Sequence, residues 1–453
     1  MPDSLFTTDA MRAVFSSRAR IGRMLDFEAA LARAAADASV IPRGAAEVIA
    51  RHCDAAAFDI AAIERGVLDS GNLAIPLVSA LTRNVGAEDD DARRYVHWGA
   101  TSQDVIDTGL VLQLRDALAL IEADVDRLAT GLALRAREHA DTLLAGRTWL
   151  QHALPITLGL KLAGFVSALD RHRERIAASR QRGLTLQFGG AAGTLASLEG
   201  QGLAIAEGLA TRLALPFPDV PWHAQRDRFC EVAASLGMLT ATLGKLGRDL
   251  ALLAQTEVGE AREPAKPGRG GSSTMPQKRN PVGASIAIAA SIRAPGLVAT
   301  MLTAAVQEHE RGLGNWPAEW ETLPEIALLA AGSLGAMIEV VAGLDIDAGR
   351  MRSNLDLAHG LIFAEAVQTA LAPVLGRESA HALVEGACRR AVAERVHLRD
   401  ILSQEQAVSS AFDASSLDRC FDPERYLGES RAFIARALAR HPATERDALR
   451  KRR

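Results

Sequence analysis

Aromatic and β-branched residues are scarce in this chain. Only 4% of its 453 residues are Phe, Trp or Tyr, and runs of β-branched residues are few. Alanine and leucine, which are strong helix formers, are plentiful instead. This composition predicts an all-α protein. The chain is too long for a single ordinary core, so two or three domains are expected.

Cysteine and positive charge are also limited. The formal net charge is −4, so there is no basic excess that would indicate a nucleic-acid partner. The cysteines lie far apart and form no CxxC pair, which argues against a zinc site or a disulfide framework and fits a reducing cytoplasm, the expected compartment. The four cysteines are Cys53, Cys230, Cys388 and Cys420.

The sequence predicts no membrane segment. Its N-terminus lacks the pattern of a signal peptide. The most apolar stretch, residues 286–306, is interrupted by Arg293 and Pro295, and we therefore expect no membrane span there.

Long apolar seams run through the middle of the chain, where leucine-rich positions step by three and four residues. This 3.5-residue spacing packs long helices at shallow angles, and the second seam alone spans roughly 36 Å at 1.5 Å per residue. Helices of that length favour an elongated bundle. The two main seams are Val111, Leu114, Leu118, Ile121, Val125, Leu128 and Leu132, and Phe229, Val232, Leu236, Leu239, Leu243, Leu246, Leu250 and Leu253.

The seams also suggest where the domains lie. Residues 1–110 contain shorter helical patterns and turns, and beyond residue 345 the regular spacing fades. We therefore predict an N-terminal helical domain over 1–110, a central long-helix bundle over 111–345 and a small C-terminal helical domain over 346–453.

Three polar segments interrupt this apolar, helical sequence. In residues 97–107, Thr101 and Ser102 suit either the cap of a helix or an anion site at its N-terminus. In residues 146–155, Gln151 and His152 can bind a carboxylate or form the polar start of a helix.

The third segment, residues 270–281, is rich in glycine and hydroxyl residues and leads to Lys278 and Asn280. Backbone amides, an ammonium group and an amide side chain can together hold an oxyanion. The breaker-rich loop over residues 263–276, which overlaps this segment, is either a mobile lid or a plain linker. The order of its glycines excludes a Walker nucleotide loop.

Residues 271–281 resemble the signature of the fumarase/aspartase superfamily, G-S-S-x-M-P-x-K-x-N-P, at every defined position. The other two polar segments are similar to the family's remaining motifs and occur in the same order. The resemblance implies a three-domain fumarase/aspartase-like fold whose long helices form a twenty-helix core in a homotetramer. It also implies active sites shared by three subunits, with no cofactor and no metal.

The resemblance assigns a role to residues in each motif. Ser272 would be the catalytic base, and His97 corresponds to the histidine that precedes the Thr-Ser motif in several members. A serine hydroxyl needs nearby amides or a cation to act as a base. The residues implied to bind substrate carboxylates are Thr101, Ser102, Gln151, Lys278 and Asn280.

Two departures from the family pattern occur together. Trp149 stands where the family usually has a histidine, and Ser285 stands where it usually has the glutamate paired with that histidine. A general acid assists a leaving amine or water, whereas a carboxylate, with a pKa near ~4, departs unaided. The double loss therefore indicates the cycloisomerase branch of the family, which forms a lactone.

The activity implied is closure of 3-carboxy-cis,cis-muconate to 4-carboxymuconolactone. Four stretches are similar to that branch: residues 96–108, 147–153, 188–195 and 221–228. This substrate carries three carboxylates, and Arg311 is a candidate partner beside Lys278. The Glu310-Arg311 pair is similar to one in adenylosuccinate lyases, but Trp316 stands where those lyases have a serine.

Two other functions stay open on the sequence. One is a fumarate-releasing lyase of the same family, resembling adenylosuccinate lyase. In either enzyme, His152 either takes over part of the missing histidine's role or is a structural histidine at a helix start. The other is a non-catalytic protein on the same fold, against which the intact Ser272, Lys278 and Asn280 argue.

Overall fold

The computed structural model describes residues 5–265, 270–271, 274–275 and 277–441. Helices dominate it, which confirms the predicted all-α class. The chain divides into two compact units, each built from three separate stretches of sequence. The first unit holds residues 1–125, 172–244 and 286–336, and the second holds residues 126–171, 245–285 and 337–453.

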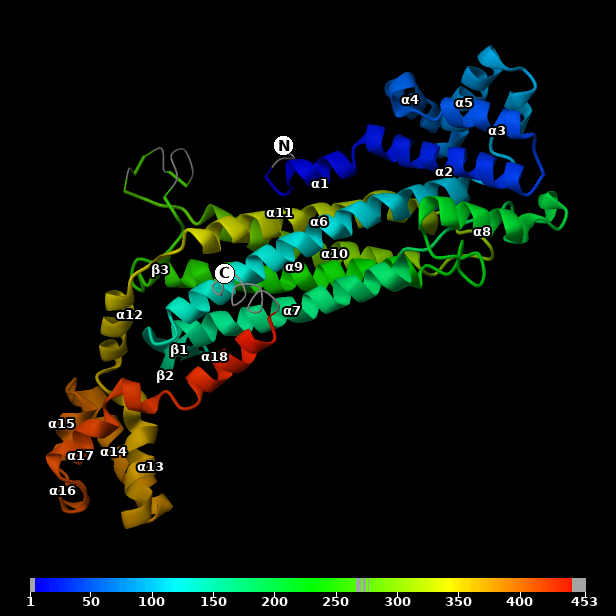
Figure 1. Cartoon of the computed structure of the whole chain (residues 1–453). Helices are drawn as coiled ribbons and strands as arrows, with labels where there is room; N and C mark the ends of the chain where they lie inside the picture. Colours follow the sequence, from blue (N-terminus) through cyan, green and yellow to red (C-terminus); the bar gives the residue numbers. More distant parts are fainter. Residues whose placement is uncertain (1–4, 266–269, 272–273, 276, 442–453) are drawn as a thin grey trace, which may run out of the picture. The chain divides into compact units, whose positions relative to one another are not determined.

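Six helices lie entirely within the first unit. The central one is α2, which packs against α3 and α8 and is drawn in blue in Figure 1. It begins at Ser17, because the Ser16 side chain accepts a hydrogen bond from the amide of Ala19 and so caps the helix. The six helices are α1 (Asp9–Val14), α2 (Ser17–Asp37), α3 (Arg43–Arg51), α4 (Ile60–Ser70), α5 (Ala74–Glu88) and α8 (Gly202–Leu213).

Five long helices contribute residues to both units. The two predicted seams lie in α6 and α9, and every seam residue is buried, so the helical periodicity is confirmed. The five are α6 (Ser102–Glu138), α7 (Leu158–Gly183), α9 (Asp227–Leu253), α10 (Val282–Ala304) and α11 (Asn315–Ala342). The predicted boundaries near residues 110 and 345 stay a prediction, because the two compact units divide the chain differently.

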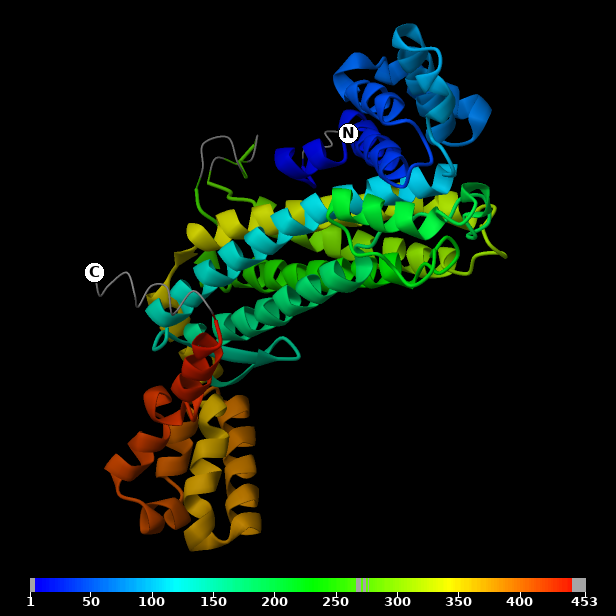
Figure 2. The same ribbon diagram turned by 45° about the vertical axis from the view of Figure 1, so that its right-hand side comes forward.

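The second unit contains the strands and the C-terminal helices, among which α13 and α14 lie side by side (Figure 2). Strands β1 (Leu143–Thr148) and β2 (Gln151–Thr157) form an antiparallel hairpin, and β3 (Ala261–Arg262) pairs with β4 (Asp345–Ile346). The helices are α12 (Ala348–Asn354), α13 (Ala364–Leu375), α14 (Arg377–Glu394), α15 (Leu398–Ser403), α16 (Gln406–Ala411), α17 (Ala414–Cys420) and α18 (Ser430–Ala439).

The β1–β2 hairpin corrects one expectation. The polar start of a helix was one interpretation of residues 146–155, but these residues form the two strands and the turn between them, and α7 begins only at Leu158. Trp149 and Leu150 occupy the turn with φ of 52° and 65°. Two consecutive left-handed residues match the twist of a tight hairpin.

Three helices, α9, α10 and α11, are long and apolar enough to cross a membrane by length and composition. The interruption by Arg293 and Pro295 was therefore too weak an argument, since α10 passes this test with both residues inside it. In α9 and α11, 61% and 67% of the apolar window is buried within the chain, but in α10 only 33% is. The apolar surface of α10 therefore needs a partner.

Candidate active site

The N-terminus of α6 is held by Asp104. Its Oδ2 accepts a hydrogen bond of 3.0 Å from the amide of Thr101, the residue before the helix. This is the reciprocal contact of a capping box, in which a side chain in the first turn reaches back to the cap residue. Thr101 and Ser102 thus stand at a helix start, as predicted, and both are partly exposed.

The same carboxylate also gathers segments distant in sequence. Asp104 is fully buried and accepts hydrogen bonds from the amides of Gly189 and Gly190, at 3.0 and 2.9 Å. The Nε2 atom of His223 lies 2.6 Å from its Oδ1 atom. Asp104 therefore joins three of the four stretches that are similar to the cycloisomerase branch.

Arg311 lies at this same helix end. Its Nε donates to the Oε1 atom of Gln103 at 2.8 Å, and its Nη2 donates to the carbonyl of Ala191 at 3.2 Å. Gln103 in turn donates to the carbonyl of His223 at 2.9 Å. These contacts orient the guanidinium beside the α6 N-terminus, and they use its Nε and Nη2 atoms.

His97 forms an ion pair that the sequence did not indicate. Its Nδ1 lies 2.5 Å from the Oε1 atom of Glu28, whose side chain is fully buried in α2. Burial disfavours the charged imidazole, but the Glu28 carboxylate, and then Asp104, outweigh it and raise the pKa of His97. The residue also has a φ of 59°, a left-handed conformation that costs about 1–3 kcal/mol outside glycine.

The first unit also contains a buried cluster of charged side chains that was not predicted from the sequence. The Arg226 guanidinium binds both Asp107 and Glu319, at 2.7 and 2.6 Å, and all three side chains are 1% exposed. The indole Nε1 of Trp316 donates to Asp107 at 3.0 Å. Trp316 is therefore part of the cluster. Spacing alone offered no signal for it.

In the second unit, Gln151 begins β2 next to the hairpin turn and is exposed. The side chain of Trp149 is 96% exposed, so its indole has almost no contact within the chain. The hairpin is held close to its turn by Arg147, which pairs with His152 in the ladder and whose guanidinium makes two hydrogen bonds, of 2.6 and 3.0 Å, to the buried Glu260. Asn354 also donates to Glu260, at 2.7 Å.

His152 follows Gln151 on the hairpin. Burial and the positive charge of Arg147 lower its pKa, although Glu260 opposes them. A histidine with a lowered pKa is a poor proton donor at neutral pH. His152 is therefore a weak candidate for the role of the missing family histidine.

The signature segment follows β3 in the same unit. Its predicted base, Ser272, lies outside the described residues. Lys278 is exposed, and the amide of Asn280 donates to the carbonyl of Gly270 at 2.8 Å, which closes the segment at its base. The Glu263 carboxylate accepts from two amides at the start of α10, at 3.0 and 2.7 Å. That helix terminus is thus already occupied by an anion.

The expected site residues thus fall into two sets. The first unit contains His97, Thr101, Ser102 and Arg311, and the second contains Gln151, Lys278 and Asn280. Among the residues that the structure describes, no group of three His, Cys, Asp or Glu side chains could hold a metal ion.

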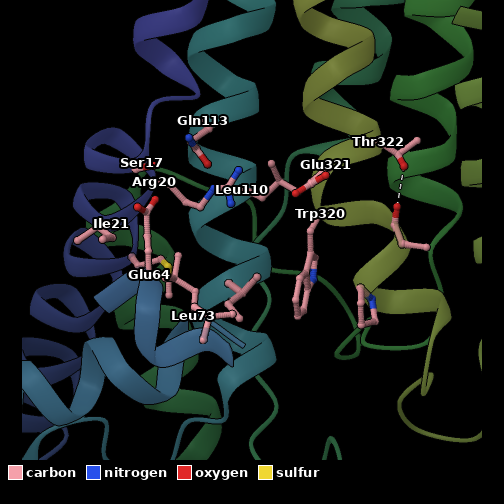
Figure 3. Close-up of a pocket in the computed structure, with 15 residues that line it drawn as sticks. Ser17, Arg20, Ile21, Glu64, Leu73, Leu110, Gln113, Trp320, Glu321 and Thr322 are labelled. Carbon is pink, nitrogen blue, oxygen red and sulfur yellow. Dashed lines mark hydrogen bonds between the residues drawn. The ribbon is translucent and has the colours of Figure 1, made fainter. Parts of the chain in front are cut away.

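A cavity of about 500 Å³ lies elsewhere in the first unit, between α2, α4, α6 and α11 (Figure 3). Arg20, Glu64 and Trp320 line it, together with apolar side chains such as Leu110. None of the expected site residues does. The cavity is thus distinct from the surface built around the α6 N-terminus.

Comparison with known proteins covers nearly the whole chain. A family model described as "Lyase" matches residues 5–296, and one described as "Adenylosuccinate lyase C-terminus" matches residues 360–437. The chain is 58% identical to the 3-carboxy-cis,cis-muconate cycloisomerase of Pseudomonas aeruginosa over 97% of its own length and 96% of the relative's.

A solved structure of a relative has nearly the same fold. The 3-carboxy-cis,cis-muconate lactonizing enzyme from Pseudomonas putida superposes with a TM-score of 0.92 at 53% identity, covering 97% of this chain and 98% of that one. A nitrosuccinate lyase from Streptomyces davaonensis is 40% identical, covering 94% of this chain and 92% of the relative. Relatives at lower identity therefore include a lyase.

Proposed function

This chain belongs to the lyase family of fumarase and aspartase, and we propose that within it the protein is a cycloisomerase that interconverts 3-carboxy-cis,cis-muconate and 4-carboxymuconolactone. The observation that carries the proposal is the 58% identity, over almost the full length of both chains, to a cycloisomerase of that name. Trp149 and Ser285 add chemical support, because neither can form the family's histidine–glutamate pair.

The reaction needs only positioning and one proton transfer. A carboxylate oxygen of the substrate adds to the conjugated double bond, and the carbon alpha to another carboxylate gains a proton. Ser272 donates that proton during lactone closure, accepts it in reverse, and regains its own from solvent. One proton is consumed overall because a carboxylate becomes an ester. Lys278 and Asn280 stabilise the aci-carboxylate intermediate.

The remaining expected residues bind the carboxylates of the substrate. Thr101 and Ser102 offer hydroxyl groups at the N-terminus of α6, where the helix dipole favours an anion. Arg311 supplies a guanidinium beside them, supported by its bonds to Gln103 and Ala191. Gln151 contributes an amide from the hairpin.

The purified protein is expected to consume 3-carboxy-cis,cis-muconate without added metal or cofactor and in the presence of EDTA. The loss of conjugated-diene absorbance follows the reaction, and chromatography identifies the lactone. Release of fumarate from adenylosuccinate or argininosuccinate, with no lactone formed, would instead identify a lyase of the family. No turnover of any of these substrates would favour a non-catalytic protein.

We further propose a homotetramer in which three subunits contribute to each active site. Trp149 and Leu150 support it, since they are 96% and 78% exposed at the tip of a hairpin, and such large apolar side chains mark an interface. On α10, Ile292 and Leu302 are exposed in the same way. We also propose that the protein is cytoplasmic and has neither a membrane nor a nucleic-acid partner. Its proposed domains are residues 1–110, 111–345 and 346–453.

Replacement of Trp149 by serine is expected to weaken the tetramer, because the substitution removes most of the apolar area at the tip of the hairpin. Sedimentation velocity at micromolar concentration should show a tetramer for the unmodified protein and smaller species for Trp149→Ser. Phe433→Ser, which alters an exposed aromatic on α18, is the matched control. A stable, active monomer would contradict both the assembly and the shared active site.

A further inference from the structure

The buried carboxylate of Glu28 requires a positive partner. Its side chain is fully buried in α2, and its Oε1 lies 2.5 Å from Nδ1 of His97. Its Oε2 has no hydrogen-bond partner among the described residues. A buried carboxylate that is neither paired nor fully hydrogen-bonded is costly. A charged His97 compensates this carboxylate, whereas a neutral one would leave it uncompensated.

The other groups that face His97 favour the same charge state. Asp104, on α6, adds a second negative charge near the imidazole and is itself bound by His223. Together with Glu28 on α2, it raises the pKa of His97 against the opposing effect of burial. Because Nδ1 faces Glu28, the remaining ring donor is Nε2, which has no partner among the residues described.

The substrate's charge suggests what this donor is for. The proposed substrate carries three carboxylates, and the expected cations are Lys278 and Arg311. Two nitrogens of Arg311 already donate to Gln103 and Ala191, so that side chain has limited capacity for a second carboxylate. A third cation close to Thr101 would complete the charge match.

We propose that Glu28 is a positioning residue that holds His97 as an imidazolium, with its Nε2–H directed at a substrate carboxylate. This inference rests on the proposed function. The pair thereby supplies a carboxylate–imidazole contact that the chain lacks at Trp149 and Ser285, but it binds an anion and does not protonate a leaving group. No bond of the imidazole is made or broken.

Replacement of Glu28 by glutamine tests the pair, because it removes the charge and keeps the shape of the side chain. At pH 8, kcat/KM is expected to fall about 100-fold, mainly through KM, as expected for a lost contact that binds substrate. The loss should shrink as the pH falls, because a growing fraction of His97 becomes protonated in the variant while the unmodified enzyme already carries the charge. Glu28→Asp should recover part of the activity because it restores the charge.

Glu47→Gln is the matched control. Glu47 lies on α3 and forms a surface ion pair with Arg33, which lies on α2 as Glu28 does. This ion pair does not involve His97. Glu47→Gln is expected to leave the pH profile unchanged. A Glu28→Gln profile that runs parallel to that of the unmodified enzyme at every pH would overturn the proposal, because a merely structural loss has no such pH dependence.

NMR titration of the imidazole provides a second measurement on the unmodified protein, with the His97 resonance assigned through His97→Asn. His97 should be protonated at pH 7 in the unmodified protein and neutral in Glu28→Gln. A neutral His97 in the unmodified protein would also overturn the proposal, even if Glu28→Gln does not fold. If the enzyme does not act on the muconate, the proposed function fails, while the titration still decides whether the ion pair exists.

Discussion

Replacing Ser272 by alanine is expected to lower kcat for lactone formation by about 10³-fold, within the range that a positioned acid–base group contributes. The hydroxyl is the proposed carrier of the proton that reaches the carbon alpha to a carboxylate, and alanine has no proton to give. KM should change little, because the carboxylates would still be bound by Arg311, Lys278 and the hydroxyls at the start of α6.

Steady-state kinetics with the diene absorbance measures both constants. Ser409→Ala, an exposed serine on α16, controls for the effect of a serine-to-alanine change as such. If Ser272→Ala keeps most of the turnover number, Ser272 is not the base, and another group must move the proton. The role of Ser272 needs this test because it is inferred from family members that keep the histidine–glutamate pair, and this chain does not.

Replacing Arg226 by methionine is expected to destabilise the protein by about 3–5 kcal/mol, the usual cost of removing one partner from a buried ion pair. The substitution removes the cation that pairs with both Asp107 and Glu319, and both of these carboxylates are 1% exposed. Burial already raises the pKa of Glu319 while Arg226 opposes that rise. Without the arginine, the carboxylates must take up protons or admit water.

The midpoint of urea denaturation, followed by circular dichroism, measures this loss. The double variant Arg226→Met with Glu319→Gln should be less destabilised than the single one, because only one uncompensated charge remains. Arg389→Ala is the surface control, since Arg389 pairs with Glu385 on the exposed side of α14 and such pairs contribute about 0.5 kcal/mol. An Arg226→Met midpoint equal to that of the control would show that the cluster is not a major source of stability.

Arg226→Met should also reduce activity, but for a different reason than Ser272→Ala. Asp107 lies one turn beyond Gln103 on α6, and Gln103 donates to it at 3.1 Å while accepting from Arg311. A shift of Asp107 therefore passes to the guanidinium of Arg311. An increase in KM with a modest change in kcat is the expected signature.

The sequence by itself determined the helices and the family. The seams of α6 and α9 repeat every three or four residues, so the information that forms and buries each helix lies within the helix itself. The signature segment, residues 271–281, is contiguous, and its resemblance to the family could be recognised without a structure. The replacements at Trp149 and Ser285 were likewise visible as single letters whose chemistry indicated lactone formation.

The hairpin of β1 and β2 was not predicted, although its residues were singled out. Its turn places Trp149 and Leu150 in left-handed conformations that bulky residues seldom adopt. Neither asparagine nor glycine, the usual signals of such a turn, is present. The hairpin is stabilised by a contact between residues far apart in sequence, because Arg147 binds Glu260, which lies 113 positions further along the chain.

Only the tertiary structure decided which charges meet. Glu28 and His97 are 69 positions apart, and Asp104 and His223 are 119 apart. The chain has 55 Asp and Glu residues, and nothing in their spacing distinguishes the few that are buried against a histidine or an arginine. An ion pair forms where packing removes two groups from water at the same place, and that place is set by contacts between whole helices, which no local pattern records.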